Sequence, residues 1–403
     1  MQPTIYRADH HNLDLSVIDP NALFVIKILK RAGYRAYLVG GCIRDMLLNE
    51  HPKDFDISTS AKPEEIKACF KSCILVGRRF RLAHVRFGNS FIEVSTFRSG
   101  DPTEEELIIK DNLWGTPEED VLRRDFTING LFYDPQENVI IDYTGGVRDL
   151  KKQFLRTIGN PFLRFKQDPV RMIRLLKILS RYDFVVDETT KEALFACKDE
   201  LLKSSKARVF EEIIKVLISS SSNKFFKLLK TSEFLSLLFS KLDCAFKTES
   251  FVEKTTLNFL KALDSFDLQD KNNIDRGFLI ATLVCPIIDF DLRLKKKTNK
   301  KITNGFILET IREQLTEFFV NSFTGCSKKN FITALLILQT QYKMTPLNPK
   351  HNKMNPKLVR HPYFRSALKL LYIRKTVNPK LEKKYIAWSE MYDENQSKES
   401  ELI

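Results

Sequence analysis

The sequence lacks any run of apolar residues approaching the roughly 20 that a helix needs to cross a bilayer. Residues 1–19 also lack the apolar segment of a secretion signal, because they are polar and include His10 and His11. We therefore expect neither a membrane-spanning protein nor a membrane partner.

Cysteine is scarce, and its spacing is not that of a metal or redox motif. The seven cysteines are odd in number, and none lies in a C-x-x-C pair. Cys69 and Cys73 lie four residues apart on what we predict to be one helix, where they serve packing. This usage favours a reducing, cytoplasmic location.

Acidic charge is in the minority, since 65 Lys and Arg outnumber 51 Asp and Glu and give a net charge of +14. A basic surplus favours polyanionic partners, either nucleic acid or an acidic membrane surface, although a basic solvated surface would give the same count. The 403 residues suffice for two or three domains.

The periodicity of apolar residues changes along the chain. Short β-type runs occupy the first third, and from about Asp168 onward strand patterns end and helical spacing dominates. The sequence predicts a hairpin from Leu82 to Val94 that turns at Gly88. The other predicted strands are 36–39, 55–57 and 131–133. This order predicts an α+β fold, with a small mixed-sheet head followed by an all-helical neck, body and tail.

A glycine pair follows the first strong strand and precedes an amphipathic helix. Gly40 and Gly41 lack Cβ atoms, so a phosphate can approach their backbone, and the helix that follows offers free N–H groups. Arg44 in its first turn can add a charge-assisted contact to a triphosphate. Many strand–helix turns use glycine for packing alone, so the pair is weak evidence by itself.

Two acids make this evidence stronger. Asp54 and Asp56 are two positions apart in a strand-like context, so both carboxylates project from one face. Adjacent carboxylates repel each other, and Mg²⁺, which prefers oxygen ligands, removes that repulsion. Glu93 on a neighbouring strand is the candidate third acid. A surface turn is the alternative for an isolated D-x-D.

Two further segments combine arginine with aspartate. Arg124 can hold phosphate, and Asp125 can orient a hydroxyl or the arginines, with simple helix capping as the alternative. Asp168 is predicted to cap the first body helix, on which Arg171, Arg174 and Lys177 recur every three residues and form a cationic stripe. Such a set can read a base edge. A solvated amphipathic helix is the alternative.

Together these segments resemble the bacterial, class II branch of the polymerase-β-like nucleotidyltransferases, which contains poly(A) polymerases and CCA-adding tRNA nucleotidyltransferases. The resemblance runs from about Tyr34 to Phe226. It implies that Asp54 and Asp56 are metal ligands and, with Asp125, catalytic residues. The nucleotide-binding residues that it implies are Gly40, Gly41, Arg44 and Arg124 for the triphosphate, and Asp168, Arg171 and Arg174 for the base.

The resemblance also implies a division of the chain and a branch of the family. The implied segments are an N-terminal arm at 1–25, a head at 26–160, a neck at 161–225, and a helical body with a C-terminal RNA-binding region at 226–403. Residues 75–85, 206–212 and 360–367 are similar to the poly(A) polymerase form, and Arg78, Arg79 and Arg81 of the first segment are expected to add positive charge near the active site. Gln167, Lys177 and an acidic end beyond Lys384 depart from that form.

The activity that the resemblance implies is template-independent transfer of AMP from ATP to RNA 3′ ends, with pyrophosphate release by a two-metal mechanism that uses Mg²⁺ or Mn²⁺. CCA addition to tRNA and a non-catalytic RNA-binding protein are the alternatives. A metal phosphohydrolase would usually bring histidine ligands, and the six histidines do not cluster near the acids. The expected partners are RNA 3′ ends, together with RNA-decay or helicase proteins, and the expected state is a monomer.

Overall fold

The computed structural model describes residues 2–11, 13–77, 81–100, 113–266, 274–297, 302–318, 326–347 and 354–400. The chain divides into two compact units. The first comprises Met1–Met172 with Asp183–Leu201, and the second comprises Ile173–Tyr182 with Leu202–Ile403.

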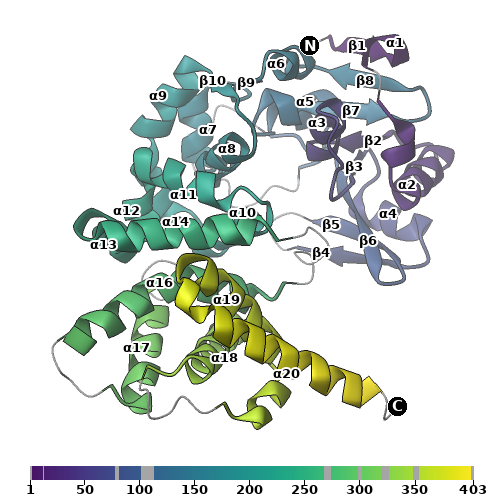
Figure 1. The fold of residues 1–403 in the computed structure, drawn as a ribbon. Helices are drawn as coiled ribbons and strands as arrows, with labels where there is room; N and C mark the ends of the chain where they lie inside the picture. Colours follow the sequence, from purple (N-terminus) through teal and green to yellow (C-terminus); the bar gives the residue numbers. More distant parts are fainter. Residues whose placement is uncertain are drawn as a thin grey trace. The chain divides into compact units, whose positions relative to one another are not determined.

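The first unit is built on an eight-stranded sheet with the strand order β1-β8-β7-β2-β3-β6-β5-β4 (Figure 1). Its strands are β1 (Thr4–Arg7), β2 (Ala36–Val39), β3 (Asp56–Thr59), β4 (Cys73–Val76), β5 (Leu82–Phe87), β6 (Ser90–Thr96), β7 (Leu131–Asp134) and β8 (Val139–Asp142). All pairs are antiparallel except β3 with β6. A parallel β9 (Phe154–Leu155) and β10 (Val185–Val186) pair stands apart.

The helices of this unit are short. They are α1 (Ala8–His11), α2 (Pro20–Arg31), α3 (Gly41–Leu47), α4 (Pro63–Cys69), α5 (Pro117–Leu122), α6 (Gly146–Lys151), α7 (Pro161–Gln167), the start of α8 (Val170–Arg181) and α9 (Glu188–Ala196). The 3-10 turns are η1 (Leu15–Val17), η2 (Thr127–Asn129) and the greater part of η3 (Lys198–Lys203), whose last two residues belong to the second unit.

Alternation along the strands separates two cores on opposite faces of the sheet. Leu38 of β2 and Ile57 of β3 belong to the larger core, which α2, α3 and α4 also line. Val39 and Phe132 belong to a smaller core on the other face. Because Val39 pairs with Asp56 across β2 and β3, Asp56 projects on the side of the smaller core.

The second unit is helical. Its elements are the remainder of α8, then α10 (Lys206–Ile218), α11 (Ser222–Thr231), α12 (Phe234–Leu238), α13 (Ser240–Thr248), α14 (Ser250–Asp264), α16 (Arg276–Lys297), α17 (Asn304–Thr316), α18 (Lys328–Met344), η6 (Pro356–Arg360), α19 (Phe364–Val377), η7 (Pro379–Leu381) and α20 (Glu382–Ser400). Residues Gly277–Ile288 of α16 are buried on every side, as expected for a central helix.

The predicted α+β class is confirmed by the sheet of the first unit and the helices of the second. The predicted hairpin at Gly88 is confirmed as well, since Phe87 pairs with Ser90 across its turn. The prediction that Cys69 and Cys73 share a helix was wrong. Cys69 ends α4 and Cys73 begins β4, because Phe70 leaves the helix in an extended conformation. Strands β1, β4, β8, β9 and β10 were not predicted. The boundaries of head, neck and body stay a prediction.

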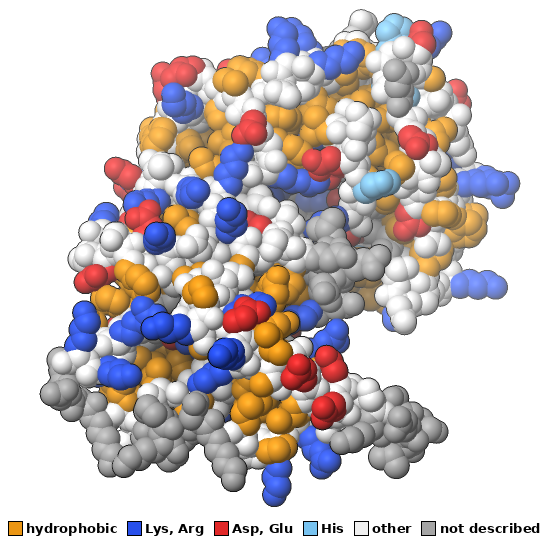
Figure 2. All heavy atoms as spheres, in the orientation of Figure 1, with side chains coloured by type: hydrophobic (Ala, Val, Ile, Leu, Met, Phe, Trp, Pro, Cys, Tyr) orange, Lys and Arg blue, Asp and Glu red, His pale blue; other side chains and the backbone are white. Residues whose placement is uncertain are grey.

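Three further observations concern surface charge, apolar helices and cysteine. Lys and Arg side chains are spread over the visible surface, with Asp and Glu between them (Figure 2), in line with the net charge of +14. Among the described residues, no helix combines the length and the apolarity that crossing a bilayer requires. All seven cysteines are free thiols.

Candidate active site

The turn between β2 and α3 requires glycine at its first position. Gly40 has φ +75°, a conformation that residues with a Cβ atom rarely adopt, and a Cβ there would lie 3.4 Å from Nη1 of Arg124. The bare backbone of Gly40 therefore lies directly beside a guanidinium. Gly41 has a similar neighbour, because its Cβ would lie 3.4 Å from Nη2 of Arg44.

Arg44 is held from two sides. Its Nε and Nη2 donate to Oδ1 of Asp45 at 2.9 and 2.7 Å, and its Nη1 donates to Oδ1 of Asn129 at 2.7 Å. The Arg44 side chain is only 11% exposed. Its planar fork is thus fixed in direction, which reduces the entropy lost when it contacts a ligand.

Arg124 has a comparable set of contacts on the smaller-core face of the sheet. Its Nη2 donates to Oδ2 of Asp120 at 2.8 Å and to Oγ of Ser58 at 3.1 Å. The guanidinium also lies over the ring of Phe132, 5.2 Å from its centroid. Ser58 is in turn bonded to Ser95 of β6 at 2.8 Å. The sheet therefore positions Arg124 beside the glycine turn.

Asp125 is buried and lies at the centre of the segment between α5 and β7. Its Oδ1 accepts from the backbone N–H of Phe126 at 2.8 Å and from Nδ2 of Asn129 at 3.1 Å. Since Asn129 also accepts from Arg44, one asparagine links Asp125 to the arginine at the glycine turn. Asp125 therefore fixes the amide of Asn129, and the prediction that Asp125 is catalytic stays a prediction.

The two acids predicted to bind metal are both exposed, but only one lies in a strand. Asp56 begins β3, and Asp54 precedes it in irregular chain. Register places Glu93 beside Asp56, because Ile57 and Val94 are partners one residue further along. Glu93 also lies 3.5 Å from Nε2 of His84.

The carboxylate oxygens of Asp54 and Asp56 suit a hard cation. Mg²⁺ is typically bound through one or two carboxylates and completes its shell with water and substrate phosphates, which the pair Asp54 and Asp56 matches. No group of three or more potential metal ligands occurs in the described part of the chain. Burial, with the charges of Asp56 and Asp45, raises the pKa of Cys42 to about 12, so that thiol stays neutral and is a poor metal ligand.

The residues predicted to contact the base lie where α7 meets α8. Asp168 is the C-cap residue of α7, and α8 begins two residues later at Val170. The backbone carbonyl of Asp168 accepts from the N–H of Arg171 at 3.0 Å. Arg171 is 6% exposed, and its Nη2 donates to the carbonyl of Arg123 at 2.6 Å. The alternative interpretation, in which this arginine lies on a solvated face of an amphipathic helix, is therefore wrong for Arg171. Arg174 belongs to the second unit.

Arg164 of α7 is a further buried arginine close in sequence to these residues. Arg164 donates to Oε1 of Gln167 at 2.8 Å and to the carbonyl of Leu122. Burial, together with the charges of Arg171 and Arg123, lowers the pKa of Arg164 to about 10. Gln167, which stands where the resemblance leads one to expect an acid, thus supplies a neutral acceptor beside a group of guanidinium side chains. Such a group favours an anionic ligand.

Two other basic side chains that the sequence placed near the site, Lys177 and Arg81, form ion pairs with glutamates. Lys177 forms an ion pair with Glu212, and burial lowers the pKa of Lys177 to about 8. It is therefore not part of an open cationic stripe. Arg81 pairs with Glu64 at 2.7 Å, whereas Arg78 and Arg79 lie outside the described residues.

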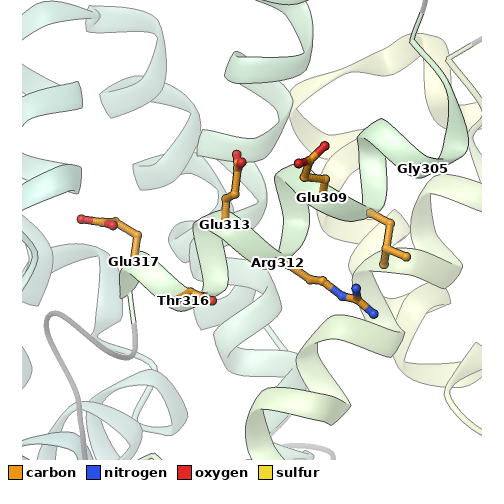
Figure 3. Close-up of a pocket in the computed structure, with 7 residues that line it drawn as sticks. Gly305, Glu309, Arg312, Glu313, Thr316 and Glu317 are labelled. Atoms are coloured by element: carbon orange, nitrogen blue, oxygen red, sulfur yellow. The ribbon is translucent and has the colours of Figure 1, made fainter.

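A hollow of about 690 Å³ lies along α17 in the second unit. Figure 3 shows Glu309 and Glu313 pointing to one side of this helix and Arg312 to the other. Glu317 adds a third carboxylate to the lining. This acidic lining repels phosphate, so we assign no nucleotide to it.

Sequence reasoning assigned no role to Asp120, Asn129 or Ser58. Asp120 could have been found, because it precedes Arg124 by four residues, which is the spacing of a helical ion pair. The role of Asn129 depends on Arg44, which is 85 positions away, and no local pattern indicates it.

Comparison with known proteins identifies the class. The profile of the family described as "Poly A polymerase head domain" matches residues 36–156, and that described as "Probable RNA and SrmB- binding site of polymerase A" matches residues 183–246. The solved Bacillus stearothermophilus CCA-adding enzyme in complex with CTP aligns over 95% of this chain and 100% of its own, with a TM-score of 0.53 and 23% identity, a likeness of fold alone. The protein is an enzyme of the polymerase-β-like nucleotidyltransferase class.

Relatives of known name show to which family within this class the chain belongs. Poly(A) polymerase I of Salmonella typhi is 33% identical over 405 residues, which cover 96% of this chain and 85% of the relative. That of Haemophilus influenzae is 40% identical, over 65% of this chain and 60% of the relative. A CCA-adding enzyme of Lactobacillus delbrueckii is 35% identical, but over 54% of each chain. The chain belongs to the bacterial poly(A) polymerase family.

Proposed function

We propose that this enzyme transfers AMP from ATP to the 3′ ends of RNA without a template and releases pyrophosphate. The observation that carries the proposal is the extent of the match to the Salmonella poly(A) polymerase I, which covers 96% of the chain, whereas the match to the CCA-adding relative covers 54%. The additional matched length supports the polyadenylating branch.

The proposed roles follow from the contacts of each residue. Asp54 and Asp56 would hold divalent ions, which supply Lewis-acid stabilisation of the attacking and leaving oxygens. Gly40 and Gly41 let the triphosphate approach the backbone. Arg44 and Arg124 are held in fixed directions beside that turn and would neutralise phosphate charge.

Asp125 would act through Asn129, which orients Arg44. The base would be read by Asp168, Arg171 and Arg174. Because Gln167 is neutral and its Oε1 is used by Arg164, we assign base reading to the charged residues that follow it.

The test uses the purified full chain with Mg²⁺ and one labelled nucleotide at a time. The acceptors are an unstructured RNA and a tRNA that lacks its 3′ CCA. Long A tails on the unstructured RNA, with little incorporation from CTP, are the expected result. Addition to tRNA alone that stops after two C and one A would assign the enzyme to CCA addition instead.

A second arm tests the metal site. Asp54→Ala should abolish addition and leave RNA binding intact, and EDTA should have the same effect on the parent enzyme. Replacing Mg²⁺ with Mn²⁺ in the same assay identifies the better ion. Retained addition by the Asp54→Ala variant would remove Asp54 from the site.

A further inference from the structure

Strands β2, β3, β6 and β5 lie side by side in that order in the sheet of the first unit (Figure 1). The residues proposed to contact the triphosphate lie on the β2 and β7 side of Asp56, because Arg124 is beside Gly40 and over the ring of Phe132. In phosphoryl transfer the attacking and leaving oxygens lie roughly in line, on opposite sides of the phosphorus. The RNA 3′ hydroxyl should therefore approach Asp56 from the other side, over β6 and β5.

The side chains of β5 and β6 divide between the two faces of the sheet. Val85, Ile92 and Val94 belong to the larger core. The residues that alternate with them project on the opposite face, which is also the face of Asp56. These residues are His84, Arg86, Phe91 and Glu93.

An aromatic pair lies on this face. The rings of Phe91 and His84 are stacked, with centroids 4.2 Å apart and an interplanar angle of 13°. We call these two rings the aromatic shelf. His84 is also the direct cross-strand partner of Glu93, which lies beside Asp56. Phe91 is nevertheless 53% exposed, so much of its ring stays open to a ligand.

A cation accompanies the aromatic shelf. Arg86 is the cross-strand partner of Phe91, so the two side chains share a face. Arg86 is exposed, and none of the ion pairs within the described residues involves it. Aromatic rings that can stack on bases, next to a cation that can contact phosphate, are the combination that binds single-stranded RNA.

Exposed phenylalanines also occur where no ligand binds, and cross-strand aromatic pairs stabilise sheets by packing alone. Phe24 of α2 is such a case, since it is 49% exposed and its ring lies 6.0 Å from that of Phe87. Phe91 differs from Phe24 in its position. It lies on the face that carries Asp56 and on the side from which the RNA should approach, whereas α2 lines the larger core on the other face.

We propose that the aromatic shelf stacks on the 3′-terminal base of the acceptor RNA and so places the terminal hydroxyl at Asp54 and Asp56. Arg86 contacts the phosphate of that nucleotide. The identity of the acceptor as RNA rests on the proposed function. Stacking tolerates any base because every base has a π-face, which suits an enzyme that extends RNA ends without a template.

The first test measures steady-state addition by the full chain at varied concentrations of RNA primer. Phe91→Ala should raise the KM for the primer about fivefold or more, because the loss of one stacked base costs at least that factor. The KM for ATP should stay unchanged. Phe91→Tyr keeps the ring and should restore the KM for the primer to that of the parent. Phe24→Ala removes an equally exposed ring from the other face, and this matched control should behave as the parent.

The second test measures binding without catalysis and locates the contacted nucleotide. Stacking quenches the fluorescence of 2-aminopurine, so the parent should quench this base at the 3′ end of an RNA, and Phe91→Ala should not. The same base in the middle of the RNA should respond alike in both proteins.

The contribution of Arg86 is tested by the dependence of RNA affinity on salt. Arg86→Ala should weaken binding and lower the number of phosphate contacts reported by that dependence by about one. Arg31→Ala removes an exposed arginine at the end of α2, and it is the charge control that should leave the salt dependence unchanged.

The outcomes distinguish the two proposals. If folded Phe91→Ala keeps the primer KM of the parent and still quenches the terminal base, the aromatic shelf is not the acceptor site, whatever the activity. If the parent adds no nucleotide to any RNA but quenching of the terminal base depends on Phe91, the catalytic proposal fails and the aromatic shelf stands. Circular dichroism reports whether each variant is folded. Phe91→Leu, which removes the ring but keeps an apolar side chain, takes the place of Phe91→Ala if that variant does not fold.

Discussion

Nη1 of Arg44 donates a hydrogen bond to Oδ1 of Asn129 at 2.7 Å across 85 positions of sequence. The same amide donates through Nδ2 to Asp125 at 3.1 Å. Both atoms of the amide group are thus used, and the asparagine fixes the arginine relative to a buried carboxylate. A change at Asn129 should therefore affect nucleotide binding through Arg44.

Asn129→Ala should raise the KM for ATP by about tenfold, because it removes a hydrogen bond to a charged group, which contributes about 1.5–3 kcal/mol. Steady-state kinetics with a fixed RNA primer measure this change. Asn89→Ala, at the exposed hairpin turn of the same unit, is the control and should leave KM unchanged. An unchanged KM for the Asn129→Ala enzyme would show that Arg44 is held without the amide.

Gly146 should not tolerate a methyl group. A Cβ there would lie 2.1 Å from the carbonyl oxygen of Thr127, and the turn is fixed because Asp142 accepts from the backbone N–H of Gly146 at 3.0 Å. Gly146→Ala should cost about 2–3 kcal/mol of unfolding free energy.

Gly305 provides the matched comparison for this substitution. Only Thr303 Oγ1, at 3.8 Å, lies near its Cβ position in α17. Gly305→Ala should therefore stabilise the protein by about 0.5 kcal/mol, chiefly by restricting the unfolded chain. Urea unfolding of both variants measures the pair, and a shift of the same sign in both would contradict the steric argument.

The sequence predicted the parts of the head whose pattern is local. Strands β2 and β7 are short runs of mainly apolar residues, β5 alternates between more and less buried positions, and the hairpin turn carries glycine, so these elements were found. Strand β1 was missed because three of its four residues are exposed and it is ordered by pairing with β8. Local patterns do not report such distant partners.

The site shows the same limit. Arg44 and Arg124 were singled out by their neighbours in sequence, but Ser58 and Asn129 hold them from other strands and turns. Lys177 was expected on an open stripe because helical spacing does not reveal Glu212, which is 35 positions away. Long-range pairing of charges decides these roles.

Asp289 and Arg374 form a buried ion pair in the helical unit, at 2.7 Å. Burial alone would lower the pKa of Arg374, but Asp289 raises it above its ordinary value, so the arginine stays charged. Asp289→Leu alone should destabilise the protein by about 3–5 kcal/mol, because it leaves a buried charge without its partner. The double variant Asp289→Leu with Arg374→Met should recover much of that loss in urea unfolding. A double variant less stable than Asp289→Leu alone would refute this account.

Cys285 should give the stability of the helical unit a dependence on alkaline pH. Burial, followed by the charge of Asp289, raises the pKa of its thiol from 9.0 to about 12. Between these values the unfolded chain releases the thiol proton and the folded chain keeps it. The stability that the neutral thiol contributes is therefore complete below pH 9.0 and is lost as the pH rises toward 12.

The measurement is the difference in unfolding free energy between the parent and Cys285→Ala, from urea titrations at a series of pH values. That difference should be constant below pH 9.0 and should shrink above it, as the parent loses stability that the variant never had. The exposed Cys244 is the control, and Cys244→Ala should show no such trend. A constant difference for Cys285→Ala across the series would mean that the buried thiol ionises at the same pH in both states.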